Sequence, residues 1–388
     1  MSHRCSACRL SPIGRSLSDR HLKRRLALVL LIACWLPSVL RSASGGEPPA
    51  DLPVTRIALG SCVKQDRPMP IWAAVRDIRP DVLLMLGDNI YGDTEDMAEL
   101  RAKYGRLAAD PGFAAVRAAV PIVAVWDDHD YGVNDGGREY PRRRESQQVF
   151  CDFFGIPADA AVRTQEGIHR SLVLGPPGRR VQFICLDTRF HRSALESLPM
   201  AARVAERVKG KGPYVPSADP EATVLGAAQW AWLAAALREP AELRIVLSSI
   251  QVASIEHGWE HWGNFPAERA RLLATLRESG AEGVIIVSGD RHSAEISMIP
   301  ADDDALAYPV FDLTASSFNQ PKRVDRDDEP NRHRLGSRFH GANFGSIEID
   351  WASAAGGGSP AVRLAIHDVD GKVVRSAEIP AAELSHAR

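Results

Sequence analysis

The chain has 388 residues, of which 45% are hydrophobic and 25% are charged, and this composition is typical of a globular protein. The formal net charge of −2 lacks the basic bias of a protein that binds nucleic acid through its phosphates, so we expect no nucleic-acid-binding surface. The length allows about two or three domains, or one large α/β domain.

Residues 1–45 have the layout of a secretory signal peptide. A basic flank that contains the Arg24–Arg25 pair precedes an apolar stretch over 26–40, and small residues follow it. This stretch is shorter than the roughly 20 residues of a membrane-spanning helix, and Pro37 interrupts it. We therefore expect a signal peptide, with the arginine pair as a candidate twin-arginine signal, and a periplasmic or secreted protein. An uncleaved membrane anchor is the alternative.

Short apolar runs alternate with amphipathic stretches after a linker over 46–53. The apolar runs predict strands at 55–62, 81–88, 121–128, 180–189, 243–251 and 283–290. The amphipathic stretches predict helices at 70–78, 96–110, 145–155, 226–239 and 265–280. This alternation is typical of βαβ units, so the sequence predicts an α/β fold with a largely parallel inner sheet.

The C-terminal segments follow a different pattern. The stretches SIEIDWA, AVRLAIHDVDG and VVRSAEIP alternate at a period of two, and Gly-rich turns separate them. They predict a C-terminal extension of antiparallel strands. Because no convincing boundary divides residues 54–388, we expect this range to form one catalytic domain.

Polar side chains follow four of the predicted strands where each strand ends. In open α/β sheets, ligands bind at the carboxyl ends of the strands. The segments GSC, LGDNIYGD, WDDHDYGVND and SGDRH supply the candidates Cys62, Asp88, Tyr91, Asp128, His129, Asn134, Asp290 and His292. The fifth strand leads into an aromatic loop in which His257 and His261 either bind metal or only shape the pocket.

These donor types predict a metal centre with more than one ion. Thiolate and phenolate suit Fe(III), whereas carboxylate and amide oxygens suit Ca²⁺, Mn²⁺ or Mg²⁺. A cluster of carboxylates without cations would repel itself. A carboxylate between two ions can bridge them, and Asp88 is the candidate. Two adjacent cations suit the hydrolysis of a phosphoryl group, while a metal-binding module without turnover is the alternative.

Three cysteines remain after the predicted signal peptide, namely Cys62, Cys151 and Cys185. At most one disulfide can therefore form in the mature chain. The sequence allows a Cys151–Cys185 bridge, but both residues also fit a buried position in the core.

Taken together, the motifs resemble the alkaline phosphatase D (PhoD-like) family of metallophosphatases. The resemblance covers most of 54–345 and rests on GSC, LGDNIYGD, WDDHDYGVND, SSIQV, WGNFPAERARLL and SGDRHSAEIS, in this order. It implies a metallophosphoesterase fold, a four-layer α/β/β/α sandwich. It also implies a secreted enzyme that uses Fe³⁺ with Ca²⁺, or another divalent metal, to hydrolyse phosphate monoesters and diesters.

The resemblance also implies roles by position. It implies that the metals are held by Cys62, Asp88, Tyr91, Asp290 and His292, with Asp88 as the bridging ligand. It also implies that Asn134 is a further metal or substrate contact. Asp128 and His129 take the place of the Asn–His pair of the wider superfamily, in which the histidine stabilises the transition state or protonates the leaving group. The segment DHDYGVND is one residue longer before its asparagine than the commoner DHE version, so the metal contact within 128–134 stays open.

We therefore expect a secreted, metal-dependent phosphoric ester hydrolase in which a metal-activated hydroxide attacks phosphorus in line. The expected substrate is a small-molecule phosphate ester, and no protein partner is implied. Phosphodiesterase or phospholipase D-type activity, the latter on a phospholipid, is the alternative, since some relatives act in this way. The Trp-rich segment 259–262 favours a lipid, whereas the chain after the signal shows no obvious exposed apolar helix.

Overall fold

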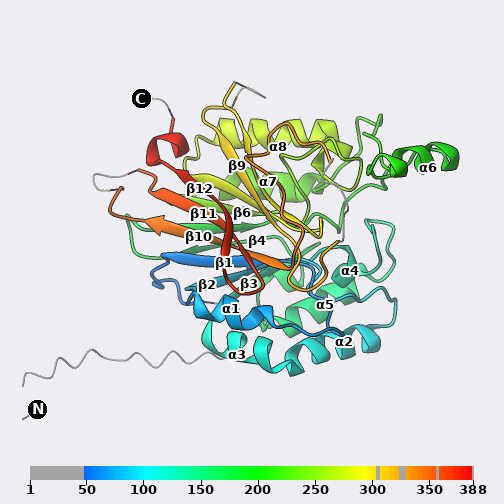
Figure 1. Ribbon diagram of the computed structural model, residues 1–388, viewed down its shortest axis with the longest axis horizontal. Helices are drawn as coiled ribbons and strands as arrows, with labels where there is room; N and C mark the ends of the chain where they lie inside the picture. The colour runs from blue at the N-terminus through cyan, green and yellow to red at the C-terminus, as the bar shows by residue number, and fades with distance from the viewer. Residues whose placement is uncertain (1–47, 303–305, 323–328, 355–357, 387–388) are drawn as a thin grey trace, which may run out of the picture. The chain divides into compact units, whose positions relative to one another are not determined.

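The computed structural model describes residues 48–302, 306–322, 329–354 and 358–386. Two six-stranded mixed sheets form the centre of this part of the chain (Figure 1). The predicted signal peptide lies outside the described residues. None of the helices in the described ranges has the length and hydrophobicity needed to cross a membrane.

The first sheet has the strand order β12-β11-β10-β1-β2-β3. Its parallel half consists of β1 (Arg56–Gly60), β2 (Val82–Leu86) and β3 (Ile122–Val125). Its antiparallel half consists of β10 (Asn343–Asp350), β11 (Ala361–Asp368) and β12 (Val373–Ile379). The predicted antiparallel extension is confirmed. Because β10 pairs with β1, the extension widens the sheet whose strands β1 and β2 precede Cys62 and Asp88.

The second sheet has the strand order β4-β5-β6-β7-β9-β8. The parallel strands are β5 (Val181–Cys185), β6 (Leu243–Leu247), β7 (Val284–Ser288) and β9 (Val310–Ala315). Antiparallel edge strands are β4 (Arg170–Leu174) and β8 (Ala294–Ile299). The sequence pattern does not predict β4, β8 or β9, because none of them is a long apolar run.

Side chains that alternate along one strand show that the two sheets pack face to face. In β6, Ile245 and Leu247 belong to the core shared with the first sheet, whereas Val246 belongs to a core shared with helices α7 and α8. In β7, Ile285 and Ile286 divide in the same way. Since successive strand residues point to opposite faces, each strand of this sheet contributes to two cores. The predicted four-layer α/β/β/α sandwich is confirmed.

Most of the helices lie on the outer faces of the two sheets (Figure 1). Five of them match predicted helices: α1 (Ile71–Asp77), α2 (Met97–Ala109), α5 (Arg143–Phe153), α7 (Gly226–Ala236) and α8 (Pro266–Ser279). The sequence pattern does not predict α3 (Pro111–Ala119), α4 (Asp128–Tyr131) or α6 (Met200–Val208). Short 3₁₀ helices are η1 (Ala161–Arg163), η2 (Trp262–Asn264) and η4 (Ala381–Leu384).

Helix α6 corrects one expectation. It contains no buried residue, and Met200, Val204 and Val208 are exposed. The chain therefore does contain an exposed helix with an apolar face.

The allowed disulfide does not form. Cys62, Cys151 and Cys185 are all buried, and none of them is part of a disulfide. Cys151 lies in α5 and Cys185 ends β5, where each thiol packs in the core. The interpretation of these two residues as buried thiols is the correct one.

Close packing next to the predicted site requires a glycine at position 60, where β1 ends. A Cβ at this position would lie 2.6 Å from the Phe318 ring. Phe318 itself packs on Trp72 with a centroid distance of 4.6 Å, so the ring cannot easily move away. We predict that Gly60→Ala lowers the free energy of unfolding by about 1–3 kcal/mol in a urea titration.

Gly105 in α2 provides the matched control for this prediction. A Cβ at Gly105 would meet nothing within 4 Å, so Gly105→Ala should stabilise the protein by about 0.5–1 kcal/mol through helix propensity. Equal effects of the two substitutions would show that packing around Phe318 does not restrict residue 60.

Candidate metal centre

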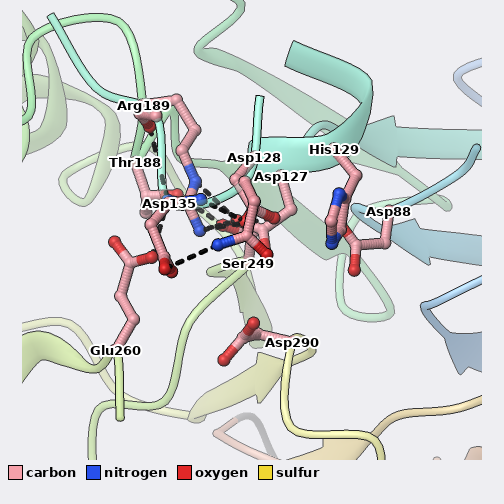
Figure 2. Close-up of polar contacts among 12 residues, drawn as sticks. Asp88, Asp127, Asp128, His129, Asp135, Thr188, Arg189, Ser249, Glu260 and Asp290 are labelled. Carbon is pink, nitrogen blue, oxygen red and sulfur yellow. Dashed lines mark hydrogen bonds and ion pairs between the residues drawn. The ribbon is translucent and has the colours of Figure 1, made fainter. Parts of the chain in front are cut away.

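The carboxyl ends of parallel strands from both sheets meet at one place. Cys62 follows β1 and Asp88 follows β2, and the Cys62 thiol donates to Asp88 Oδ2 at 3.3 Å. The same thiol lies 3.1 Å from Ser316 Oγ, just after β9 of the second sheet. Figure 2 shows Asp88 beside His129, and Asp290 below the pair Asp127 and Asp128, on a different element.

Left-handed backbone is concentrated at the predicted ligands. Cys62, Asp88, Asp290 and His292 have φ of 60°, 49°, 64° and 54°, and they are four of the seven non-glycine residues with positive φ in the described ranges. This conformation costs about 1–3 kcal/mol per residue and is found mainly where function fixes a side chain. The strand ends are thus bent so that these side chains turn toward one another.

Three overlapping groups of donor atoms result. Within each group the ligand atoms all lie within 4.8 Å of one another. The groups are Cys62, Asp88 and His292; Asp88, Asp128 and His129; and Asp127, Asp128 and Asp290. Asp88 belongs to the first two groups and Asp128 to the last two, so these two carboxylates are the ones that adjacent ions could share.

Burial makes this arrangement unfavourable without cations. Desolvation, followed by the charge of Asp128, raises the pKa of Asp88 well above its ordinary value. Desolvation also raises the pKa of Asp290, to about 7. Asp88 Oδ1 is buried and has no hydrogen-bond partner among the described residues. Buried carboxylates with unused oxygens fit metal ions, because a cation compensates both the lost hydration and the mutual repulsion.

Cys62 and Tyr91 offer a thiolate and a phenolate as donors in addition to the carboxylates. The Tyr91 hydroxyl lies 2.8 Å from His292 Nε2, which places the phenol beside the first donor group. Burial, together with nearby Asp88, raises the pKa of both the Cys62 thiol and the Tyr91 phenol. A bound metal reverses this effect, since a coordinating thiol is deprotonated outright.

His129 lies at the edge of the donor groups and is held by Asp93. Its Nδ1 lies 2.7 Å from Asp93 Oδ1, and its ring lies tilted against the Tyr91 ring with a centroid distance of 4.2 Å. Although burial lowers the pKa of His129, the carboxylates of Asp128 and Asp93 outweigh it and raise the pKa to about 9. Without a cation at Asp128, the protonated imidazole is therefore favoured at neutral pH.

The two loop histidines, His257 and His261, belong to none of these donor groups. The Asn134 side chain is exposed and donates to Asp135 Oδ2 at 2.6 Å, so its contact with metal or substrate stays a prediction. His257 Nε2 lies 3.1 Å from Gln251 Oε1, and its Nδ1 accepts from the Trp259 N–H at 3.0 Å. These contacts favour the interpretation that His257 shapes the loop, and the role of His261 stays a prediction.

Arg189 is the main site residue that the sequence pattern does not reveal. It is fully buried, and its Nε donates to Asp127 Oδ1 at 2.7 Å while its Nη1 contacts Glu260 Oε2 at 2.7 Å (Figure 2). Ser249 also donates to Asp127. These contacts compensate the charge of Asp127 and fix its position next to Asp128. No local signal marks Arg189, since its partners lie 62 and 71 residues away.

We predict that Arg189→Met lowers the free energy of unfolding by about 3–5 kcal/mol, because Asp127 would remain buried without its cation and Glu260 would keep only its ion pair with Arg192. The measurement is urea unfolding at pH 7. The matched control is Arg180→Met, which removes the partly exposed ion pair with Glu242 and should cost below about 1 kcal/mol. Similar losses in the two variants would contradict a special role for Arg189.

Comparison with known proteins agrees with this geometry. The sequence profile described as PhoD-like phosphatase matches residues 57–350. Alkaline phosphatase D of Bacillus subtilis (strain 168) is 24% identical over 327 residues, which is 72% of this chain and 54% of that protein. The chain therefore spans about half the length of this curated relative.

Among solved structures, one titled "Structure of PhoD" superposes with a TM-score of 0.61. The match covers 86% of this chain and 73% of that chain at 18% identity, which supports a shared fold. The family profile covers well over half of the sequence and includes every candidate ligand. The chain belongs to the PhoD-like phosphatase family.

Proposed function

We propose that the protein is a metal-dependent hydrolase of phosphoric esters. The observation that carries this proposal is the set of three overlapping donor groups, linked by Asp88 and Asp128, in a chain of the PhoD-like phosphatase family. Two-metal phosphatases hold their ions about 3.5–4 Å apart, and a shared carboxylate suits such a spacing. The substrate is a small-molecule phosphate ester.

The donor chemistry suggests which ions the site would hold. Cys62, with Tyr91 nearby, supplies sulfur and phenol donors that suit Fe³⁺, and Asp88 would be shared with a second ion. Asp127, Asp128 and Asp290 offer only carboxylate oxygens, which suit Ca²⁺ or another hard divalent cation. Bound cations would polarise the phosphoryl oxygens and lower the pKa of a coordinated water.

The protein's own groups would orient the ester and supply a proton. His129 is held by Asp93 and adjacent to Asp128, so it can stabilise a phosphoryl oxygen or, in its protonated form, donate a proton to the leaving oxygen. Burial raises the pKa of Asp127, and the Arg189 guanidinium opposes this rise and holds the side chain in place, so we assign Arg189 a positioning role.

Export stays part of this proposal. The signal-like residues 1–45, with the Arg24–Arg25 pair, support a periplasmic or secreted protein. Loss of these residues from protein recovered in the extracytoplasmic fraction of a producing cell would support export.

The experiment compares turnover of p-nitrophenyl phosphate and bis-p-nitrophenyl phosphate before and after chelation and metal return. We predict turnover that is lost on chelation, and at least about a 100-fold lower rate in Asp88→Asn, because this substitution removes the shared ligand. The matched control is Asp66→Asn, an exposed carboxylate paired with Arg106, which should leave the rate unchanged.

The other outcomes distinguish the alternatives. Preference for the diester would favour phosphodiesterase or phospholipase D-type activity at the same site. Bound metal without turnover of either ester would favour a non-catalytic metal-binding protein. Full activity of Asp88→Asn, or full activity after complete removal of metal, would contradict the proposal.

A further inference from the structure

Helix α6 presents a cluster of exposed apolar side chains. Met200, Val204 and Val208 are 72%, 62% and 85% exposed. The other exposed large hydrophobic residues in the described ranges, Leu335 and Val373, are only 37% and 36% exposed. Single exposed apolar residues are ordinary, but three on one short helix form a contiguous patch, and such patches mark interaction surfaces.

The helical period places this patch on one side. Residues advance by about 100° each, so Met200, Val204 and Val208 lie within an arc of about 80°. The exposed residues of α6 are Met200, Ala201, Val204, Ala205, Arg207 and Val208. Arg203 and Glu206 are half-buried on the other side, where Arg203 donates to the Leu198 carbonyl at 2.6 Å. The outward face is therefore apolar except for Arg207, which borders it beside Met200.

Cations border the apolar face. Arg207, Lys209 and Lys211 lie at the C-terminal end of α6 and just beyond it. Glu206 is the only acidic residue between 200 and 211, and it pairs with Lys209 at 2.6 Å. This segment is thus positively charged in a chain whose net charge is −2, so the complementary surface is anionic.

Trp259 connects α6 with the metal centre. Arg207 lies 6.0 Å from the centroid of the Trp259 ring, and Lys322 lies 4.3 Å from it. A groove between α6 and this ring is lined by Met200, Arg203, Val204, Arg207, Lys211, Pro213 and Trp259. The backbone N–H of Lys322 donates to the carbonyl of His292, a predicted metal ligand, at 3.1 Å. A surface that binds α6 would therefore lie near the segment that carries His292.

We propose that the outward face of α6, with its bordering cations and Trp259, docks on an anionic lipid bilayer. An amphipathic helix with a basic border lies in the headgroup region and buries its apolar side chains there. Nine residues span only about 14 Å, too little to provide the roughly 800 Å² that each partner buries in a stable protein–protein interface. Docking requires no turnover, so the inference goes beyond the proposed function.

The experiment measures co-sedimentation of the full chain with vesicles of phosphatidylcholine, with and without phosphatidylglycerol. We expect the wild type to bind the anionic vesicles more strongly and to lose this preference at high salt. The variant Met200→Ser/Val204→Ser/Val208→Ser should bind the anionic vesicles at least about tenfold more weakly. Val373→Ser, an exposed apolar residue on β12, is the matched control and should bind like the wild type.

Two further readouts keep the test decisive. Urea unfolding and turnover of p-nitrophenyl phosphate should be the same in the triple variant and the wild type, because the three side chains point to solvent. Undiminished vesicle binding by the triple variant would overturn the proposal. A concentration-dependent dimer in sedimentation velocity that the triple variant abolishes would also overturn it, because a second copy of the chain would then cover this face.

Discussion

Four carboxylates meet at the junction of two sheets and impose the main constraint on this structure. Asp88, Asp127 and Asp128 are buried and Asp290 is half-buried, so their charges repel one another in a region with little water. Arg189 compensates this repulsion beside Asp127, and Arg291 lies 3.9 Å from Asp290. Asp88 Oδ1 and Asp128 Oδ1 nevertheless have no hydrogen-bond partner among the described residues. Cations next to these oxygens would complete the electrostatic balance, and the proposed chemistry rests on them.

The fold supplies this arrangement through its strand ends. Parallel strands of two sheets that pack face to face bring several carboxyl ends to one place, and left-handed backbone at Cys62, Asp88, Asp290 and His292 directs the side chains inward. Close packing around Gly60 and Phe318 holds β1 against the second sheet. The conformational cost at the strand ends is offset by the two cores, so strain is stored next to the ligands and not spread through the domain.

The sequence predicts the parallel core and the convergence of its strand ends, because both depend on local patterns. Apolar runs define the inner strands, and polar residues directly follow them. The sequence does not predict the ion pair between Arg189 and Glu260, since this pair joins distant segments and leaves no periodic signal. Helix α6 is also missed, because a nine-residue stretch with three alanines gives a weak pattern when no core covers its apolar face. The contact of Asn134 with metal or substrate stays a prediction, since its side chain donates to Asp135 here.

The most direct test of the account is a crystal structure of the purified protein with anomalous scattering measured at metal absorption edges. The account predicts two or more cations, with an oxygen of Asp88 about 2.0–2.6 Å from an ion and Cys62 or His292 bound to the same centre. A metal-free crystal with the same carboxylate positions, grown from protein that hydrolyses phosphate esters at its full rate, would contradict it.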